Sequence, residues 1–209
     1  HAPNPKDTIA EQVGTQPKKP ATQIPPPVIL GLDPGIHSKQ TSSTRAKHNT
    51  LALCPGAAYG ATKRWPHYAK IANHYLNQGW QVQLLGAPNE QDTLEAINAE
   101  CNNGCALHTG DASLEDKIDL LGNAALAICN DSGLLHIAAA TQTPVMGIYG
   151  STSPDFTPPL GAHTRIAQLD NLKCRPCFKR KCPLKGDAHL KCLIDITPEH
   201  VLTLAEDLL

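Results

Sequence analysis

Short apolar runs alternate with segments of helical periodicity along most of this 209-residue chain. The runs are largely uninterrupted by polar residues, which is typical of strands buried on both faces of a parallel sheet. Each run is followed by a stretch whose apolar residues fall on one helical face, as expected for helices that connect parallel strands. We therefore predict strands over 51–54, 80–85, 105–107, 125–130, 144–149 and 164–169, and helices over 66–78, 91–99, 114–121, 133–140 and 197–208.

The predicted fold class is α/β, a Rossmann-like parallel sheet with helices on both faces. We expect one such domain over residues 51–209, with its most regular part at 50–150. Residues 1–50 are rich in Pro, Lys, Thr, Gln and Ser and lack a sustained period. This composition predicts a largely irregular linker, or the remnant of a missing N-terminal domain. Because the chain begins with His1 rather than Met, we expect a fragment of a longer protein.

Composition argues against several classes of partner. The formal net charge is -1 at pH 7, so no overall field attracts nucleic acid or an anionic membrane. No apolar run reaches the length of a transmembrane helix, and the N-terminus lacks the pattern of a signal peptide. We predict a cytoplasmic protein that binds no nucleic acid and has no transmembrane segment.

The strongest candidate for chemistry is the turn between the fourth apolar run and its helix. Asp131 and Ser132 are good N-cap residues, and Gly133 allows a ligand to approach the backbone. The first amides of such a helix favour an anion, and ligands bind at the carboxyl ends of parallel strands. His136 lies one helical turn on, so it can face the same ligand. The alternative is an ordinary strand-to-helix turn with a capping Asp.

Two neighbouring loops favour a phosphate ligand. Residues 150–154 form a second small-residue loop at the same predicted sheet edge, and two such loops suit a diphosphate. The glycine-bearing loop after the first run ends in Lys63 and Arg64, which can supply the counter-charge. A helix N-terminus does not stabilise cations, so their place here favours a nearby anion. The alternative is a solvent-exposed pair. We expect Pro66 in the first turn of the following helix.

Four of the eight cysteines cluster in a predicted loop over residues 170–192 that is rich in Cys, Lys and Arg. Four thiols that begin with a C-x-x-C spacing can hold zinc tetrahedrally, and His189 is a spare ligand. The irregular later spacings favour free or redox-active thiols over a structural zinc site. The clustered residues are Cys174, Cys177, Cys182 and Cys192.

Six short motifs occur in an order and spacing that resembles a known enzyme family. Together they resemble the ADP-heptose:lipopolysaccharide heptosyltransferases of glycosyltransferase family 9, and most closely the heptosyltransferase II type. The likeness covers residues 51–209, and the long final motif makes it specific. The motifs are Pro55-Gly56-Ala57, Lys63-Arg64-Trp65-Pro66, Gly86-Ala87-Pro88-Asn89-Glu90, Gly110-Asp111 with Leu114, Asn130-Asp131-Ser132-Gly133-Leu134 with His136, and Tyr149-Gly150 with Ser153-Pro154-Asp155-Phe156-Thr157-Pro158-Pro159.

The resemblance implies a GT-B enzyme with two facing Rossmann-like domains, of which this chain looks like the C-terminal, donor-binding half. It implies that Lys63 contacts the diphosphate, Glu90 the adenosine ribose and the backbone near Ala112 the adenine. It further implies that the turn at Asp131 meets the phosphate and the heptose. The full implied donor-binding set is Lys63, Arg64, Glu90, Ala112, Asp131, Ser132, Gly133, Leu134 and His136.

The implied reaction is an inverting transfer of heptose from ADP-heptose to the lipopolysaccharide inner core, at the cytoplasmic membrane face of a Gram-negative bacterium. It requires no cofactor and no catalytic metal, and the protein is cytoplasmic or peripheral to the inner membrane. In the family the base is a carboxylate of the N-terminal domain, so we expect the catalytic base outside this chain. The main alternative is a non-catalytic nucleotide-binding module. A zinc-stapled interaction domain is a third possibility that rests on the cysteines alone.

Overall fold

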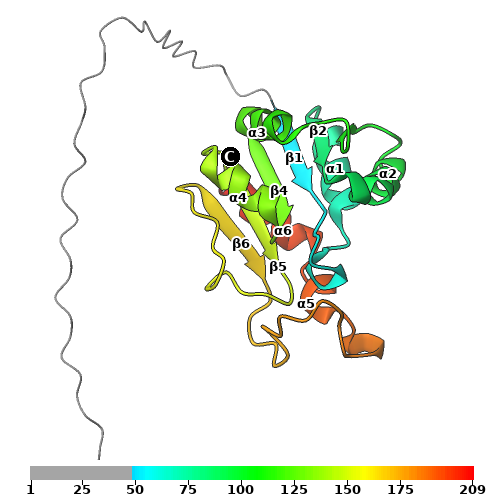
Figure 1. Ribbon diagram of the computed structural model, residues 1–209, viewed down its shortest axis with the longest axis vertical. Helices are drawn as coiled ribbons and strands as arrows, with labels where there is room; N and C mark the ends of the chain where they lie inside the picture. The colour runs from blue at the N-terminus through cyan, green and yellow to red at the C-terminus, as the bar shows by residue number, and fades with distance from the viewer. Residues whose placement is uncertain (1–48) are drawn as a thin grey trace, which may run out of the picture. The chain divides into compact units, whose positions relative to one another are not determined.

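One parallel sheet organises residues 49–209, the part of the chain that the computed structural model describes. Its six strands run in the order β3-β2-β1-β4-β5-β6 (Figure 1). Three of them are buried along their whole length, which explains their uninterrupted apolar sequences. The strands are β1 (Thr50–Cys54), β2 (Gln81–Leu85), β3 (Ala106–His108), β4 (Leu126–Asn130), β5 (Val145–Tyr149) and β6 (Thr164–Gln168).

Helices connect the strands, and side-chain caps fix where two of them begin. Ser113 Oγ accepts a hydrogen bond from the Asp116 amide at 3.1 Å, and Thr197 Oγ1 accepts one from the His200 amide at 3.2 Å. Ser and Thr are among the preferred N-cap residues, because their side-chain oxygens can accept such bonds. The α-helices are α1 (Tyr68–Asn77), α2 (Gln91–Glu100), α3 (Leu114–Asn123), α4 (Gly133–Ala140), α5 (Lys191–Ile194) and α6 (Pro198–Glu206), and the 3-10 turns are η1 (Ala61–Lys63), η2 (Pro88–Glu90) and η3 (Gly186–Ala188).

The sheet separates two apolar layers, because successive strand residues point to opposite faces. On β1, Leu51 and Leu53 belong to the layer with α1, α2 and α6, whereas Ala52 and Cys54 belong to the layer with α3 and α4. Figure 1 shows α4 in front of the sheet and α6 behind it. The layer under α3 and α4 is rich in Ala and Cys. Such small side chains let these helices pack close to the strands.

The order of the strands reverses between β1 and β4, which are neighbours at the centre of the sheet. Such a switch point leaves a crevice at the carboxyl ends of the strands, where α/β proteins bind ligands. The buried Asn130 side chain ties the loops there together. Its Nδ2 donates to the Pro55 carbonyl at 2.6 Å, and its Oδ1 accepts from the Trp65 amide at 3.2 Å. The predicted phosphate loops after β1 and β4 therefore meet at one place.

The predicted elements are confirmed, with differences at their ends. β6 is an edge strand of the sheet, and α6 packs on β6 and α1. Pro66 does not lie in the first turn of α1, because that helix begins at Tyr68 with His67 as its N-cap residue. The predicted loop over 170–192 contains η3 and runs into the short helix α5, which includes Cys192.

The predicted linker over residues 1–50 lies almost entirely outside the described residues and stays a prediction. The first strand begins one residue before the predicted domain boundary at 51, because Thr50 already pairs with Gln81 of β2. Within residues 49–209, no helix combines the length and the apolar character needed to cross a bilayer.

Candidate functional site

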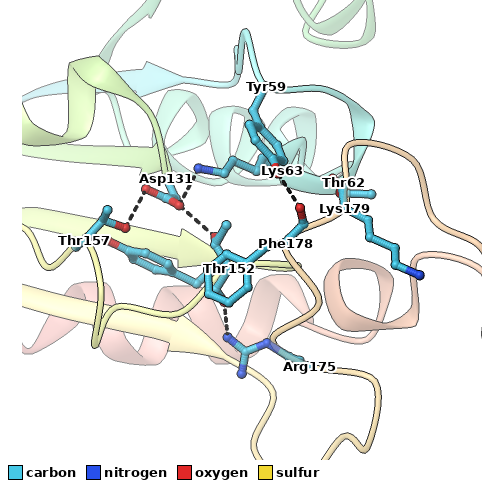
Figure 2. A network of polar contacts seen from close by, with 10 residues as sticks. Tyr59, Thr62, Lys63, Asp131, Thr152, Thr157, Arg175, Phe178 and Lys179 are labelled. Carbon is cyan, nitrogen blue, oxygen red and sulfur yellow. Dashed lines mark hydrogen bonds and ion pairs between the residues drawn. The ribbon is translucent and has the colours of Figure 1, made fainter.

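A buried ion pair joins the two loops predicted to bind phosphate. Lys63 Nζ lies 2.6 Å from Asp131 Oδ2, and the two side chains are 14% and 4% exposed. The Asp131 carboxylate also accepts hydrogen bonds from the hydroxyl groups of Thr152 at 2.7 Å and Thr157 at 3.4 Å (Figure 2). One cation and two hydroxyl groups thus compensate the burial of this charge.

The N-terminus of α4 begins beside the ion pair. Ser132 is the N-cap residue, but its side chain does not cap the helix. The prediction of a side-chain cap from Asp131 or Ser132 is wrong, because Lys63 and two threonines hold the Asp131 carboxylate instead. The amides of Gly133 and Leu134 cannot be satisfied by an intrahelical carbonyl, so they are available to an anion.

A cavity of about 310 Å³ opens next to the α4 N-terminus. Its walls are mostly apolar, and the buried residues Glu90 and Lys117 are the charged members of its lining. An apolar cavity with a few polar groups at a switch point suits a flat ring such as a nucleobase. The other lining residues come from the loops after β1, β2 and β4 and from α3 and α4: Gly56, Ala57, Ala58, Gly86, Ala87, Pro88, Leu114, Ser132, Gly133, Leu134 and Ile137.

Glu90 is held in place by its own loop. Its Oε2 accepts a hydrogen bond from the Ala87 amide at 2.9 Å, and the residue is 6% exposed. The carboxylate lies against Gly56, where a Cβ atom would be only 1.9 Å from Oε2. Glycine at position 56 is therefore required for this close approach. Carboxylate oxygens accept more than one hydrogen bond, so Glu90 can still receive a ligand hydroxyl.

The ion-pair residues Lys63 and Asp131, and three other predicted site residues, lie outside the cavity lining. Arg64 directs Nε and Nη2 to the Ala57 carbonyl, at 3.3 and 3.2 Å, and so braces the loop after β1. Ala112 precedes the lining residue Leu114 in the loop between β3 and α3, and His136 is half-buried on α4. The predicted contacts of these residues with a ligand stay predictions.

The two threonines of the ion-pair network were not singled out by the sequence. Thr152 lies in the predicted small-residue loop, and Thr157 lies in the Ser-Pro-Asp-Phe-Thr-Pro-Pro motif, so each carried a signal. Tyr149 supports them, since its hydroxyl donates to the Thr157 carbonyl at 2.6 Å. Burial, and then the charge of Asp131, raise the pKa of Tyr149. Tyr149 is therefore a neutral donor throughout the physiological range.

Lys117 is a second residue that the sequence did not single out. Its Nζ donates to the Thr109 carbonyl at 2.9 Å, and the residue lines the cavity although it is only 8% exposed. The signal was present in the sequence, because a lysine falls on the same helical stripe as Leu114 and Leu121. A buried cation in a cavity wall is rare unless it serves a ligand or a fixed acceptor.

The loop rich in Cys and Lys is anchored beside the ion pair. Tyr59 donates its hydroxyl hydrogen to the Phe178 carbonyl, and Thr62 donates to the Lys179 carbonyl (Figure 2). The Arg175 guanidinium donates to the carbonyls of Gly150 (2.7 Å), Leu169 (2.7 Å) and Thr152 (2.9 Å) and to Gln168 Oε1 (2.9 Å). The loop is therefore part of the wall around the site.

The four clustered thiols line a separate cavity of about 220 Å³. All eight cysteines lie in the described part of the chain, and all are free thiols. No group of three His, Cys, Asp or Glu side chains in residues 49–209 is arranged to hold a metal ion. Burial, together with the neighbouring thiols, raises the pKa of Cys192 to about 11. The zinc-site hypothesis stays a prediction.

The chain is similar to heptosyltransferases in sequence and in structure. It is 36% identical over 198 residues to lipopolysaccharide heptosyltransferase 2 of Salmonella typhimurium, and the alignment covers 87% of this chain and 54% of that relative. It is 39% identical over 165 residues to lipooligosaccharide heptosyltransferase 2 of Haemophilus influenzae, and this alignment covers 76% of this chain and 47% of that relative. The solved structure of E. coli ADP-heptose lps heptosyltransferase II matches with a TM-score of 0.65 at 34% identity, over 79% of this chain and 48% of that chain. The chain thus spans about half the length of the relatives it matches.

Most of the chain takes part in the family match. The model described as glycosyltransferase family 9 (heptosyltransferase) matches residues 19–187. The sequence relatives carry the name heptosyltransferase 2, which agrees with the type that the six motifs resemble. The parallel α/β sheet agrees with the solved structure of a member of that type. The chain belongs to glycosyltransferase family 9, the heptosyltransferases.

Proposed function

We propose that this chain binds ADP-heptose and forms the donor-binding part of an inverting heptosyltransferase that extends the inner core of lipopolysaccharide. The observation that carries the proposal is the convergence of Lys63, Asp131 and the uncapped N-terminus of α4 beside an apolar cavity. A nucleoside diphosphate sugar has matching parts, namely a flat base, a diphosphate and a polar sugar. The names of the related proteins support adenine and heptose as the specific groups.

The nucleoside occupies the apolar cavity in this proposal. The base lies between the loop after β2 and Leu114, with the backbone near Ala112 at its edge. The Glu90 carboxylate accepts hydrogen bonds from the ribose hydroxyls, because it is buried and already oriented by the Ala87 amide. This arrangement holds the α-phosphate toward the start of α4.

The diphosphate meets Lys63 and the amides of Gly133 and Leu134, which supply a cation and a helix N-terminus. Arg64 adds positive charge nearby. Asp131 cannot accept a hydrogen bond from an ionised phosphate, so its role is to accept hydroxyls of the heptose and to orient Lys63. His136, one turn along α4, lies beside the sugar.

The proposed reaction breaks the bond between the anomeric carbon and the diphosphate. A base removes the proton of an acceptor hydroxyl, whose oxygen attacks the anomeric carbon from the face opposite ADP and inverts it. Lys63 and the α4 amides stabilise the negative charge that develops on the departing ADP, so these groups alone can replace a metal ion there. We place the base in the half of the relatives that this chain does not match.

We place the protein in the cytoplasm, peripheral to the inner membrane, because the proposed acceptor is anchored at that face. A non-catalytic nucleotide-binding module would use the same cavity and the same cation. It would not require Asp131 to recognise the sugar, so the two functions differ in what the heptose contributes to binding.

Calorimetry with ADP, ADP-heptose, UDP and GDP tests the proposal on the 209-residue chain. A charge-assisted contact is worth about 1.5 to 3 kcal/mol, so Lys63→Ala is expected to weaken both adenine ligands about tenfold or more. Asp131→Asn is expected to weaken ADP-heptose more than ADP, because the carboxylate serves the sugar. Lys70→Ala, which removes an exposed cation of α1, is the matched control.

Three outcomes separate the possibilities. Affinity for ADP that is unchanged in Lys63→Ala would refute the phosphate site. Equal loss of ADP and ADP-heptose in Asp131→Asn would favour the nucleotide-binding module. Tighter binding of UDP or GDP than of ADP would show that the base has been wrongly assigned.

We further propose that transfer requires no bound metal and that the clustered thiols stay reduced and free. Elemental analysis of the purified, reduced protein is expected to find no zinc bound to these thiols. At pH 8, alkylation is expected to modify the exposed Cys174 before Cys192, because burial raises the pKa of Cys192 to about 11. One zinc per chain, with Cys174, Cys177, Cys182 and Cys192 all protected, would establish the structural site instead.

A further inference from the structure

We infer that an exposed surface beside the ion pair receives the acceptor, and that it recognises a saccharide that carries anionic groups. This acceptor surface consists of Phe156, Phe178, Lys179, Arg180 and Lys181. The inference deepens the proposed function and rests on it, since it assigns a site to the second substrate of the same reaction.

Positive charge is concentrated in the loop that carries most of this surface. Residues 173–185 contain six Lys or Arg residues and no Asp or Glu, whereas the whole chain has a formal net charge of -1. Lys179, Arg180 and Lys181 are exposed, and they form no ion pair with any residue of the described part. Asp170 and Asp187 flank the segment from outside. Unneutralised cations held together on one loop indicate an anionic partner.

This charge is located next to the proposed donor phosphates. Two cations lie near the Tyr59 ring, with Lys63 Nζ 4.9 Å and the Arg180 guanidinium carbon 5.1 Å from its centroid. The two cations are therefore no more than 10.0 Å apart. Two hydrogen bonds hold the loop there. The Tyr59 hydroxyl donates to the Phe178 carbonyl (Figure 2), and the Phe178 amide donates to the Ser151 carbonyl.

Two aromatic rings complete the surface. Phe156 and Phe178 are 70% and 43% exposed, and their rings meet edge to face with centroids 5.2 Å apart. Phe156 directly precedes Thr157, whose hydroxyl donates to Asp131. The pair therefore lies beside the carboxylate that we assign to the heptose. Exposed aromatic patches of this kind mark ligand sites, and a ring face can pack against the apolar face of a sugar.

A saccharide explains this combination better than a lipid surface does. Basic and aromatic residues together also bind anionic membranes, but the cations here lie beside Lys63 and the rings beside Asp131. An acceptor must approach the donor at that place for a hydroxyl to reach the anomeric carbon. Because Arg donors match both phosphate and carboxylate, either anion on the saccharide can provide the contact.

The test measures binding of a deacylated lipopolysaccharide core oligosaccharide to the full 209-residue chain, with ADP present. The oligosaccharide is used untreated, after phosphatase treatment and after methyl esterification of its carboxylates. Arg180→Glu is expected to weaken binding of the untreated form about tenfold or more and to change the ADP affinity less than twofold. Lys70→Glu makes the same kind of charge change on exposed α1 and is expected to have no effect.

The treated forms show which anion Arg180 contacts. Arg180→Glu is expected to weaken binding of every form except the one from which that anion has been removed. Phe156→Ser is expected to weaken all three forms equally, since it removes packing and not charge. If the parent chain binds ADP but not the oligosaccharide, or if Lys70→Glu weakens it as much as Arg180→Glu, the inference is wrong and the proposed donor site stands. Binding of phosphatidylglycerol vesicles through the same residues, without binding of the oligosaccharide, would assign the surface to the membrane. Failure to bind ADP would overturn the proposed function itself.

Discussion

The buried Glu90 carboxylate leaves no room for a side chain at position 56. We expect Gly56→Ala to destabilise the protein by about 1 to 3 kcal/mol, because a Cβ atom 1.9 Å from Oε2 must displace a buried carboxylate from the Ala87 amide. In a Glu90→Ala background the same substitution is expected to cost little. Denaturant unfolding of the four proteins of this double-mutant cycle measures the coupling.

Gly122→Ala is the control for that cycle, since a Cβ atom there meets only Thr141, at an ordinary distance of 3.7 Å. In the last turn of α3 it is expected to leave stability unchanged or to raise it. Additive effects of Gly56→Ala and Glu90→Ala would show that the two residues do not constrain each other.

At the scale of residues, the sequence singled out candidate site residues but not the contacts between them. Lys63 and Asp131 stood out because they lie in glycine-bearing loops that follow apolar strands, whereas Glu90 was implied by the resemblance to the family. The pairing of Lys63 with Asp131 could not be predicted, since 68 residues separate them and only the sheet brings them together. Lys117 was overlooked because exposed lysines are common on helices.

At the scale of elements, Arg175 fastens the Cys- and Lys-rich loop to the ends of β5 and β6. We expect Arg175→Lys to lower the free energy of unfolding by about 1 to 3 kcal/mol, since a single ammonium group cannot reach four oxygens that a guanidinium fork joins. Trypsin is then expected to cleave earlier within Lys179–Lys181.

Arg165→Lys provides the comparison for Arg175→Lys. Arg165 lies exposed on β6, and its 3.8 Å pair with Asp207 is solvent-screened. Its replacement is expected to alter neither stability nor cleavage. A proteolytic pattern common to both variants would show that Arg175 does not hold the loop.

The strands were predictable because a sheet buried on both faces needs uninterrupted apolar runs, as Leu126–Asn130 has. Helix starts were predictable where the cap is local, as at Ser113 and Thr197. The start of α4 was predicted at the correct residue, but its side-chain cap was not, because the Asp131 carboxylate pairs with a long-range partner, Lys63. The loop after β6 has no periodic pattern, so its anchoring by Arg175 could not be read from the sequence.

At the scale of the whole molecule, we expect the 209-residue chain to bind ADP-heptose without transferring heptose at a useful rate. Holding donor, acceptor and base together is worth up to about 7 to 11 kcal/mol of barrier. This chain spans about half the length of its relatives, and we place the base in their other half. A transfer assay with ADP-heptose and a core acceptor measures the rate.

Addition of a polypeptide that corresponds to the unmatched half of a relative is expected to raise that rate. Transfer by the 209-residue chain alone, at the rate of an intact heptosyltransferase, would show that its own residues include the base. Within residues 49–209, Asp155 would then be the first carboxylate to replace, because it lies in the loop that carries Phe156 and Thr157.

The pairing of Lys63 with Asp131 has a consequence for how ligands arrive. Because its cation is already paired, this site adds little long-range attraction of its own, so association of the nucleotide sugar is expected to depend less on ionic strength than binding of the acceptor does. The unpaired cations of residues 173–185 have the opposite property, because salt screens them directly. An increase in ionic strength is therefore expected to slow the encounter with the acceptor more than the encounter with the nucleotide sugar.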